Sequence, residues 1–355
     1  MRLLALPAAT LALLTLTSAL PSPQSSKPLP LLIWHGLGDR YDAEGLHSVG
    51  ELAKKIHPGT YVHYIRLNDD GDEDRKSTFF GNVTAQIEQV CSDLHNDKEL
   101  RSAAGGKHGE LLVDAIGFSQ GGQFLRGLLQ TCDGLSIRNL ITFGSQHNGI
   151  AAIKACGTWD LLCKGALALM KSNAWTQYVQ SNVVPAQYYR TLNESTGLAS
   201  EEFLESSGFL ADINNEREGK NETYKERLIN NLRGKFIMFV FEDDTTVIPL
   251  ESGWFQEVVY NKTQDGEEER IVVPLRDRPI YQEDWLGLKV LDQRGSLVFR
   301  RHPGDHMQLD EGVLEETFGE FLGPVGKQEV EVVLKEDGEE ELQKCGDIET
   351  LSTGP

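Results

Sequence analysis

The sequence predicts an α/β fold with a mostly parallel central sheet and helices on both faces. Stretches with helical spacing, of which 123–129 is the clearest, separate a series of short apolar runs. Strands that alternate with helices form parallel sheets, because each connection crosses back over one face of the sheet. A chain of 355 residues is long enough for one large domain of this kind. The apolar runs lie at 28–34, 61–66, 111–118, 140–143 and 235–241.

Two of these predicted strands end in glycine-rich loops. The run at 28–34 leads into His-Gly-Leu-Gly-Asp at 35–39, which we call the glycine loop, and the run at 111–118 leads into Gly-Phe-Ser-Gln-Gly at 117–121. The binding crevice of a parallel sheet lies outside the carboxyl ends of its strands. We therefore expect both loops at the edge of the sheet where a ligand binds.

Ser119 is the predicted nucleophile. It lies at the centre of a G-x-S-x-G pentapeptide, whose glycines permit a sharp strand-to-helix turn that lifts the hydroxyl out of the sheet. Roughly one chain in five of this length would contain the pattern by accident. The apolar strand before it and the helical spacing after it supply the context of a nucleophile elbow, which predicts an α/β-hydrolase fold.

A serine hydroxyl needs a general base, which on this fold follows the acid late in the chain. His302 and His306 are the late histidines, and His306 lies in a loop after the predicted strand at 296–300. The orienting acid is expected at a strand end between serine and histidine. Position alone leaves open three consecutive carboxylates after the run at 236–241, namely Glu242, Asp243 and Asp244.

An oxyanion hole completes such a site. One backbone N–H comes from the residue after the nucleophile, which is Gln120, and the other from the loop after an early strand. The glycine loop has the composition for the second donor, and we predict the N–H of Leu37.

The N-terminus predicts entry into the secretory pathway. Arg2 precedes an apolar run at 3–16 and a group of small residues, which is typical of a cleavable signal peptide at 1–19. An oxidising compartment favours disulfides, and the spacing of the five cysteines suggests Cys91 with Cys132 and Cys156 with Cys163, leaving Cys345 free. Four Asn-x-Ser/Thr triplets are glycosylation candidates: Asn82, Asn193, Asn221 and Asn261.

The net charge of −20 argues against nucleic acid as a partner, since phosphate binding requires a basic surface. No stretch after the signal peptide has transmembrane length.

The strand pattern lapses at 149–233, which we interpret as an insert in a catalytic domain spanning 28–325. An acidic segment at 326–355 is expected to be a mobile tail, with a short edge strand at 330–334 as the alternative. The sequence does not indicate an oligomeric state.

From about residue 28 to 323 the chain resembles the palmitoyl-protein thioesterases, lumenal lysosomal enzymes that remove long acyl chains from cysteine. The resemblance implies that Ser119 is the nucleophile, that His306 is the base, and that Asp244 is the acid. It also supports both disulfides. Asp243 stands where animal relatives carry a glycosylated asparagine, and Arg40 and Tyr41 replace a cysteine pair. The acidic tail has no counterpart. The shared motifs are at 33–39, 117–126, 209–214, 251–255, 284–288 and 304–306.

This resemblance implies a serine hydrolase that cleaves palmitoyl and similar thioesters through an acyl-serine intermediate, without metal or cofactor. Its partners would be S-acylated proteins or peptides and long-chain fatty acids, in the lysosomal or vacuolar lumen or outside the cell. An oxygen-ester lipase or esterase with the same triad is one alternative. A non-catalytic lipid-binding protein on a hydrolase scaffold is another.

Overall fold

Six parallel strands form the central sheet in the order β2-β1-β3-β4-β5-β8. The computed structural model describes residues 27–104, 109–158, 160–262 and 267–324. The predicted α/β-hydrolase fold class is confirmed. The strands are β1 (Leu31–Trp34), β2 (Val62–Tyr64), β3 (Leu111–Phe118), β4 (Leu135–Phe143), β5 (Phe236–Phe241) and β8 (Leu297–His302).

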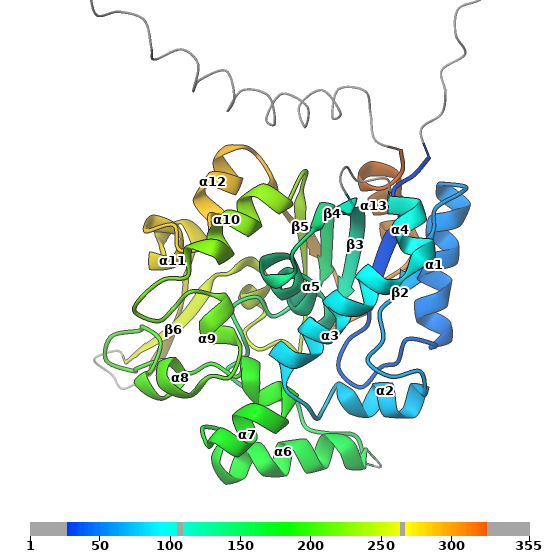
Figure 1. Cartoon of the computed structure of the whole chain (residues 1–355). Coiled ribbons are helices and arrows are strands. Elements are labelled where there is room, and N and C mark those ends of the chain that lie inside the picture. Colours follow the sequence, from blue (N-terminus) through cyan, green and yellow to red (C-terminus); the bar gives the residue numbers. More distant parts are fainter. Residues whose placement is uncertain (1–26, 105–108, 159, 263–266, 325–355) are drawn as a thin grey trace, which may run out of the picture.

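Apolar side chains of the strands alternate between two cores, which explains why the strands read as continuous apolar runs. Leu31 and Ile33 face a core with α1 (Glu44–Ile56) and α13 (Glu311–Phe321). Leu32 and Trp34 face the opposite core, which contains helices that lie in front of the strands in Figure 1. These helices include α3 (Val83–Asn96), α5 (Gln120–Thr131) and α10 (Glu222–Asn231).

The predicted insert contains short helices joined by loops in the part that the structure describes. Its elements are α6 (Leu161–Asn173), α7 (Gln177–Asn182), a 3-10 helix (Val184–Tyr188), α8 (Glu201–Ser206), α9 (Leu210–Ile213) and α10. Helices α6 and α7 lie at the lower end of Figure 1, away from the edge where the described chain begins and ends.

The remaining elements include an antiparallel hairpin that the sequence analysis did not predict. The hairpin pairs β6 (Glu257–Lys262) with β7 (Glu268–Val273) outside the central sheet. The short helices are α2 (Gly71–Ser77), α4 (Lys98–Ala104), α11 (Pro279–Gln282), α12 (Leu288–Gln293) and the 3-10 segments Leu250–Trp254 and Leu275–Asp277.

Two disulfides tie these elements together, and both join the cysteines that the sequence analysis paired. Cys91–Cys132 connects α3 to the end of α5, and Cys156–Cys163 connects the start of the insert to α6. The signal peptide, Cys345 and the acidic tail lie outside the described residues. Within the described ranges, no helix is both long enough and apolar enough to span a membrane.

Candidate active site

Ser119 lies on a sharp turn between β3 and α5. Its φ of 51° is unusual for a residue with a side chain, and its N–H donates to the carbonyl of Phe143 at 2.8 Å. A Cβ at Gly117 would come within 2.2 Å of the Cα of Gly122, so the turn closes only with glycine there. The serine is 9% exposed, which leaves its hydroxyl at the wall of a cavity.

Two side chains from distant parts of the sequence, His306 and Asp244, form a hydrogen-bonded series with Ser119. His306 Nε2 lies 3.0 Å from Ser119 Oγ, and His306 Nδ1 lies 2.8 Å from Asp244 Oδ2. His306 follows β8 and Asp244 follows β5, so neighbouring parallel strands deliver both side chains to one edge of the sheet. This geometry allows the imidazole to accept the serine proton while the carboxylate holds its other nitrogen.

Of the three carboxylates left open by position, only Asp244 contacts His306 among the described groups. Its Oδ1 accepts hydrogen bonds from the N–H groups of Thr246 and Val247, each at 2.8 Å, which turns the carboxylate inward. Glu242 and Asp243 are exposed. His302, the other late histidine, contacts the carbonyl of Gln308 instead.

Asp305 links the loop of the acid to the loop of the histidine. Its Oδ1 accepts from the N–H of Thr245 at 2.8 Å and from the N–H of His306 at 2.7 Å. These backbone donors hold the pKa of Asp305 well below its usual range. On the opposite side of the imidazole, a Cβ at Gly144 would lie 3.0 Å from His306 Cε1, so glycine there leaves room for the ring.

The residues predicted to donate to the oxyanion belong to the two segments that meet at Ser119. Gln120 begins helix α5, so its N–H has no partner within the helix. The glycine loop passes directly beside the serine, since a Cβ at Gly36 would lie 3.1 Å from Ser119 Cβ. Leu37 follows Gly36 and lines the same cavity as Ser119. Gln120 is thus next to Ser119 in the chain, and Leu37 follows the residue that packs beside Ser119 Cβ.

A cavity of about 570 Å³ opens beside Ser119 and His306. Its wall combines the glycine loop, helix α1, the insert, and the residues after His306, so the predicted insert forms only part of it. Sequence reasoning did not identify these lining residues, although several directly follow the predicted loops. The apolar ones include Leu37, Leu46, Val49, Phe79, Phe118, Ile150, Ile153, Val247, Met307 and Leu309.

A buried histidine lies behind the cavity wall. His147 is fully buried against Phe236 and Phe255, with ring centroids 5.1 Å away in both cases. Its Nε2 is 3.2 Å from Thr142 Oγ1, and its Nδ1 has no partner among the described groups. Burial lowers the pKa of His147 well below its ordinary value, and the charge of Arg126 lowers it further.

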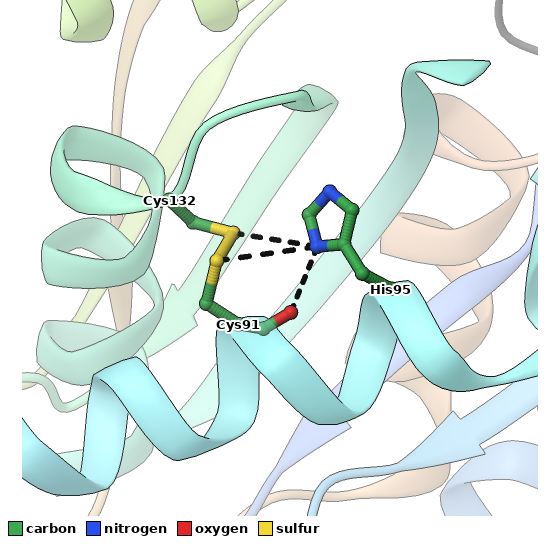
Figure 2. Close-up of side chains that lie close together, drawn as sticks. All are labelled: Cys91, His95 and Cys132. Atoms are coloured by element: carbon green, nitrogen blue, oxygen red, sulfur yellow. Dashed lines mark hydrogen bonds between the residues drawn. A yellow bond between two sulfur atoms is a disulfide. The ribbon is translucent and has the colours of Figure 1, made fainter.

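One group of three metal-type ligands occurs within the described ranges, and Figure 2 shows it. His95 Nδ1 lies 4.0 Å from the sulfurs of both Cys91 and Cys132, and its shorter contact is to the carbonyl of Cys91 at 2.8 Å. The two sulfurs form a disulfide, so neither is a thiolate that could bind a metal. The group therefore reads as a disulfide flanked by an imidazole.

The four glycosylation candidates differ in exposure. Asn193, Asn221 and Asn261 are exposed, whereas Asn82 is half-buried. Asn82 and Asn221 also cap helices, accepting hydrogen bonds from the N–H groups of Ala85 and Thr223.

Comparisons with known proteins agree with this architecture. The family model described as palmitoyl protein thioesterase matches residues 30–306. "Palmitoyl-protein thioesterase 1" of Caenorhabditis elegans is 34% identical over 305 residues, covering 86% of this chain and 94% of the relative. A Schizosaccharomyces pombe "Palmitoyl-protein thioesterase-dolichyl pyrophosphate phosphatase fusion 1" is 35% identical over 289 residues, covering 80% of this chain and 42% of the fusion.

A human relative called "Lysosomal thioesterase PPT2" is more distant, with 27% identity over 285 residues that cover 79% of this chain and 82% of the relative. The family match extends from the start of the first central strand to His306, so it includes Ser119, Asp244 and His306 and every residue of the cavity wall except Met307 and Leu309. This protein belongs to the palmitoyl-protein thioesterase family.

Proposed function

We propose that the protein hydrolyses long-chain fatty acyl thioesters, with palmitoyl-cysteine in proteins or peptides as substrate and Ser119 as nucleophile. Membership of the family makes the chain a thioester hydrolase. The observation that carries the assignment of residues is the continuous contact from Ser119 Oγ through His306 to Asp244.

The reaction proceeds in two acyl transfers. Ser119 Oγ attacks the thioester carbonyl while its proton passes to His306 Nε2, and the tetrahedral intermediate collapses to acyl-serine as the cysteine thiol leaves with that proton. Water then attacks the acyl-serine with His306 again as base, releasing the fatty acid and restoring the hydroxyl. Asp244 keeps the imidazole oriented and stabilises the imidazolium in both halves.

Two features of the site suit a thioester. The N–H groups of Leu37 and Gln120 would hold the oxyanion of each tetrahedral intermediate. A thiol has a pKa near 8.5, so it leaves with less help from protonation than an amine does. A triad that lacks a second acid is therefore sufficient for this leaving group.

The acyl chain is expected to bind in the 570 Å³ cavity, whose wall carries apolar side chains from several elements beside Ser119. Burial of each methylene contributes about 0.8 kcal/mol, so a long chain gains affinity that a short chain lacks. The disulfides and the exposed Asn-x-Ser/Thr triplets suit a lumenal or secreted protein. We propose that the protein acts in the lumen of the lysosome or vacuole or outside the cell.

The test compares hydrolysis of a palmitoyl-cysteine peptide with that of a palmitoyl oxygen ester, together with labelling by a fluorophosphonate. Wild type is expected to cleave the thioester and to label, whereas Ser119→Ala does neither while keeping the same melting temperature. Cleavage of the oxygen ester alone would identify an esterase. Binding of palmitate without labelling or turnover would identify a lipid-binding protein instead.

A further inference from the structure

Helix α2 and the residues after it hold the glycine loop at Gly38. Arg75 Nε donates to the carbonyl of Gly38, and the N–H of Gly38 donates to Thr78 Oγ1, both at 2.8 Å. Gly38 has a φ of +80°, and a Cβ there would lie 3.3 Å from the ring of Phe79. One short segment therefore fixes both polar backbone groups of the residue next to Leu37.

A buried carboxylate of the same helix holds the first residue of the glycine loop and Tyr41, two residues beyond its end. Asp74 Oδ2 lies 2.9 Å from His35 Nε2 and accepts from the N–H of Tyr41, also at 2.9 Å. Its Oδ1 accepts from the N–H of Leu67 at 2.7 Å. The side chains of His35 and Asp74 are 1% and 0% exposed, so water does not compete for these bonds.

Arg75 also reaches the insert. Its second terminal nitrogen donates to Asp160 Oδ2 at 2.9 Å, while Asp160 Oδ1 accepts from the N–H of Cys163 and caps helix α6. Asp160 and Cys163 both line the cavity beside Ser119. A single guanidinium thus connects the glycine loop, which carries the predicted oxyanion donor, to the insert that walls the cavity.

We infer that Arg75 is a positioning residue for the oxyanion hole, and that its pair with Asp160 makes this position depend on the insert. The inference rests on the proposed function only in assigning Leu37 as a donor to the oxyanion. Arg75 touches no reacting atom. It acts through the carbonyl of Gly38, the residue that follows Leu37.

Arginine suits this role because its planar fork can donate to two acceptors in different directions. The Arg75 and Asp160 side chains are 32% and 28% exposed, so solvent screens the pair and its worth for stability is small. The larger effect of Arg75 is expected on the position of the oxyanion donor. Loss of an oxyanion donor typically costs about 100-fold or more in turnover, and a displaced donor costs a fraction of that.

The experiment measures kcat and KM of the variants Arg75→Met and Asp160→Asn, with butyryl and palmitoyl esters as substrates. Arg75→Met is expected to lower kcat for both chain lengths by roughly 10-fold with little change in KM. Asp160→Asn keeps a good helix cap, since asparagine and aspartate are equivalent at that position. Asp160→Asn is expected to lower kcat only for the palmitoyl ester, by about 3-fold. A palmitoyl chain that fills the cavity would no longer influence the glycine loop, because the Asp160–Arg75 ion pair that links the insert to the loop is lost.

Lys76→Met is the matched control, because Lys76 is the next cation on the same helix and its ammonium group bonds only to exposed Glu73 among the described residues. It should leave kcat and KM unchanged. Arg75→Lys retains the charge but offers one point donor, so an intermediate kcat is expected even if Arg75→Met folds poorly. A change in KM alone, or no difference between Arg75→Met and Lys76→Met, would overturn the inference.

Both thioesters and p-nitrophenyl oxygen esters of each chain length are used. If wild type cleaves only the oxygen esters, the proposed substrate is wrong, and the Arg75 comparison still stands on those rates. If it cleaves neither, the rate of fluorophosphonate labelling at Ser119 replaces kcat, and equal labelling of wild type and Arg75→Met refutes the positioning role.

Discussion

At the scale of single residues, sequence order was sufficient to nominate Ser119 and His306, but it left three adjacent carboxylates equivalent. The difference between them is the direction in which each side chain turns. Asp244 turns inward because its Oδ1 accepts the N–H groups of Thr246 and Val247. Such local loop geometry is not encoded in spacing, and only the family resemblance separated the three in advance.

Replacing Asp244 with asparagine should lower kcat by about 10³-fold or more, because the amide favours the wrong tautomer of His306 and cannot stabilise the imidazolium. Asp243→Asn, at the exposed neighbour, is the control and should stay within about 2-fold of wild type. Steady-state kinetics on a palmitoyl thioester, with melting temperatures for folding, measure both. Equal losses in the two variants would contradict the assignment of the acid.

His147 predicts an acid-sensitive contribution to stability. Burial depresses its pKa in the folded protein, while in the unfolded chain the pKa is about 6.5. Below pH 6.5 the unfolded chain therefore binds more protons, and the free energy of unfolding falls by up to about 1.4 kcal/mol per pH unit until the folded pKa is reached.

Urea unfolding of wild type and His147→Gln at pH 7.5 and pH 5.0 checks this linkage. The decrease between the two pH values should be smaller in the variant by roughly 2 kcal/mol. Only the decrease within each protein is compared, since the substitution also alters packing against Phe236 and Phe255. The same decrease in both proteins would show that His147 is not responsible.

At the scale of elements, apolar runs predicted the strands of the central sheet because parallel strands are buried on both faces. The run at 111–118 coincides with β3, whereas the run at 140–143 captured only the end of β4 (Leu135–Phe143). The first half of β4 was missed because it contains Ser136, Arg138 and Asn139, which are buried through specific hydrogen bonds. The hairpin β6–β7 was missed because Asn261, Glu268, Glu269 and Arg270 interrupt its apolar pattern at exposed positions.

The Cys156–Cys163 disulfide holds the start of α6 against the cavity. Replacing both cysteines with serine should raise KM for a palmitoyl thioester several-fold more than KM for a butyryl thioester, because that wall of the cavity loosens. The eight-residue loop contributes about 2 kcal/mol in the chain-entropy model. Kinetics on both chain lengths test the expectation, and a parallel change in both KM values would contradict it.

At the scale of the whole molecule, the sheet topology explains why segments from the first strand of the central sheet to the last form one site. Loops at the carboxyl ends of β1, β3, β5 and β8 all open toward the same cavity. The alternating pattern of the sequence was sufficient to predict that edge. It could not predict how the insert packs, because contacts such as Arg75 with Asp160 depend on the tertiary path of the chain.

The Cys91–Cys132 disulfide is expected to contribute to the stability of the whole domain. Its cysteines are 41 residues apart, and closing such a loop stabilises the fold by about 4 kcal/mol in the chain-entropy model. Cys91→Ala with Cys132→Ala should lower the free energy of unfolding by up to that amount, measured by urea denaturation. Both cysteines lie outside the cavity lining, so kcat of the folded fraction should be unchanged. A fall in kcat without loss of stability would contradict this separation.

The bare backbone at Gly144 has a consequence for how the protein could be used. A methyl group there would lie 2.9 Å from Met307 and Phe241 and 3.0 Å from His306 Cε1, at a position where φ of +56° already disfavours a side chain. Gly144→Ala would then displace the proton acceptor, together with Met307 at the cavity wall, while Ser119 stays on its own turn. Such a protein would retain acylated clients without processing them, and would serve as bait for identifying them.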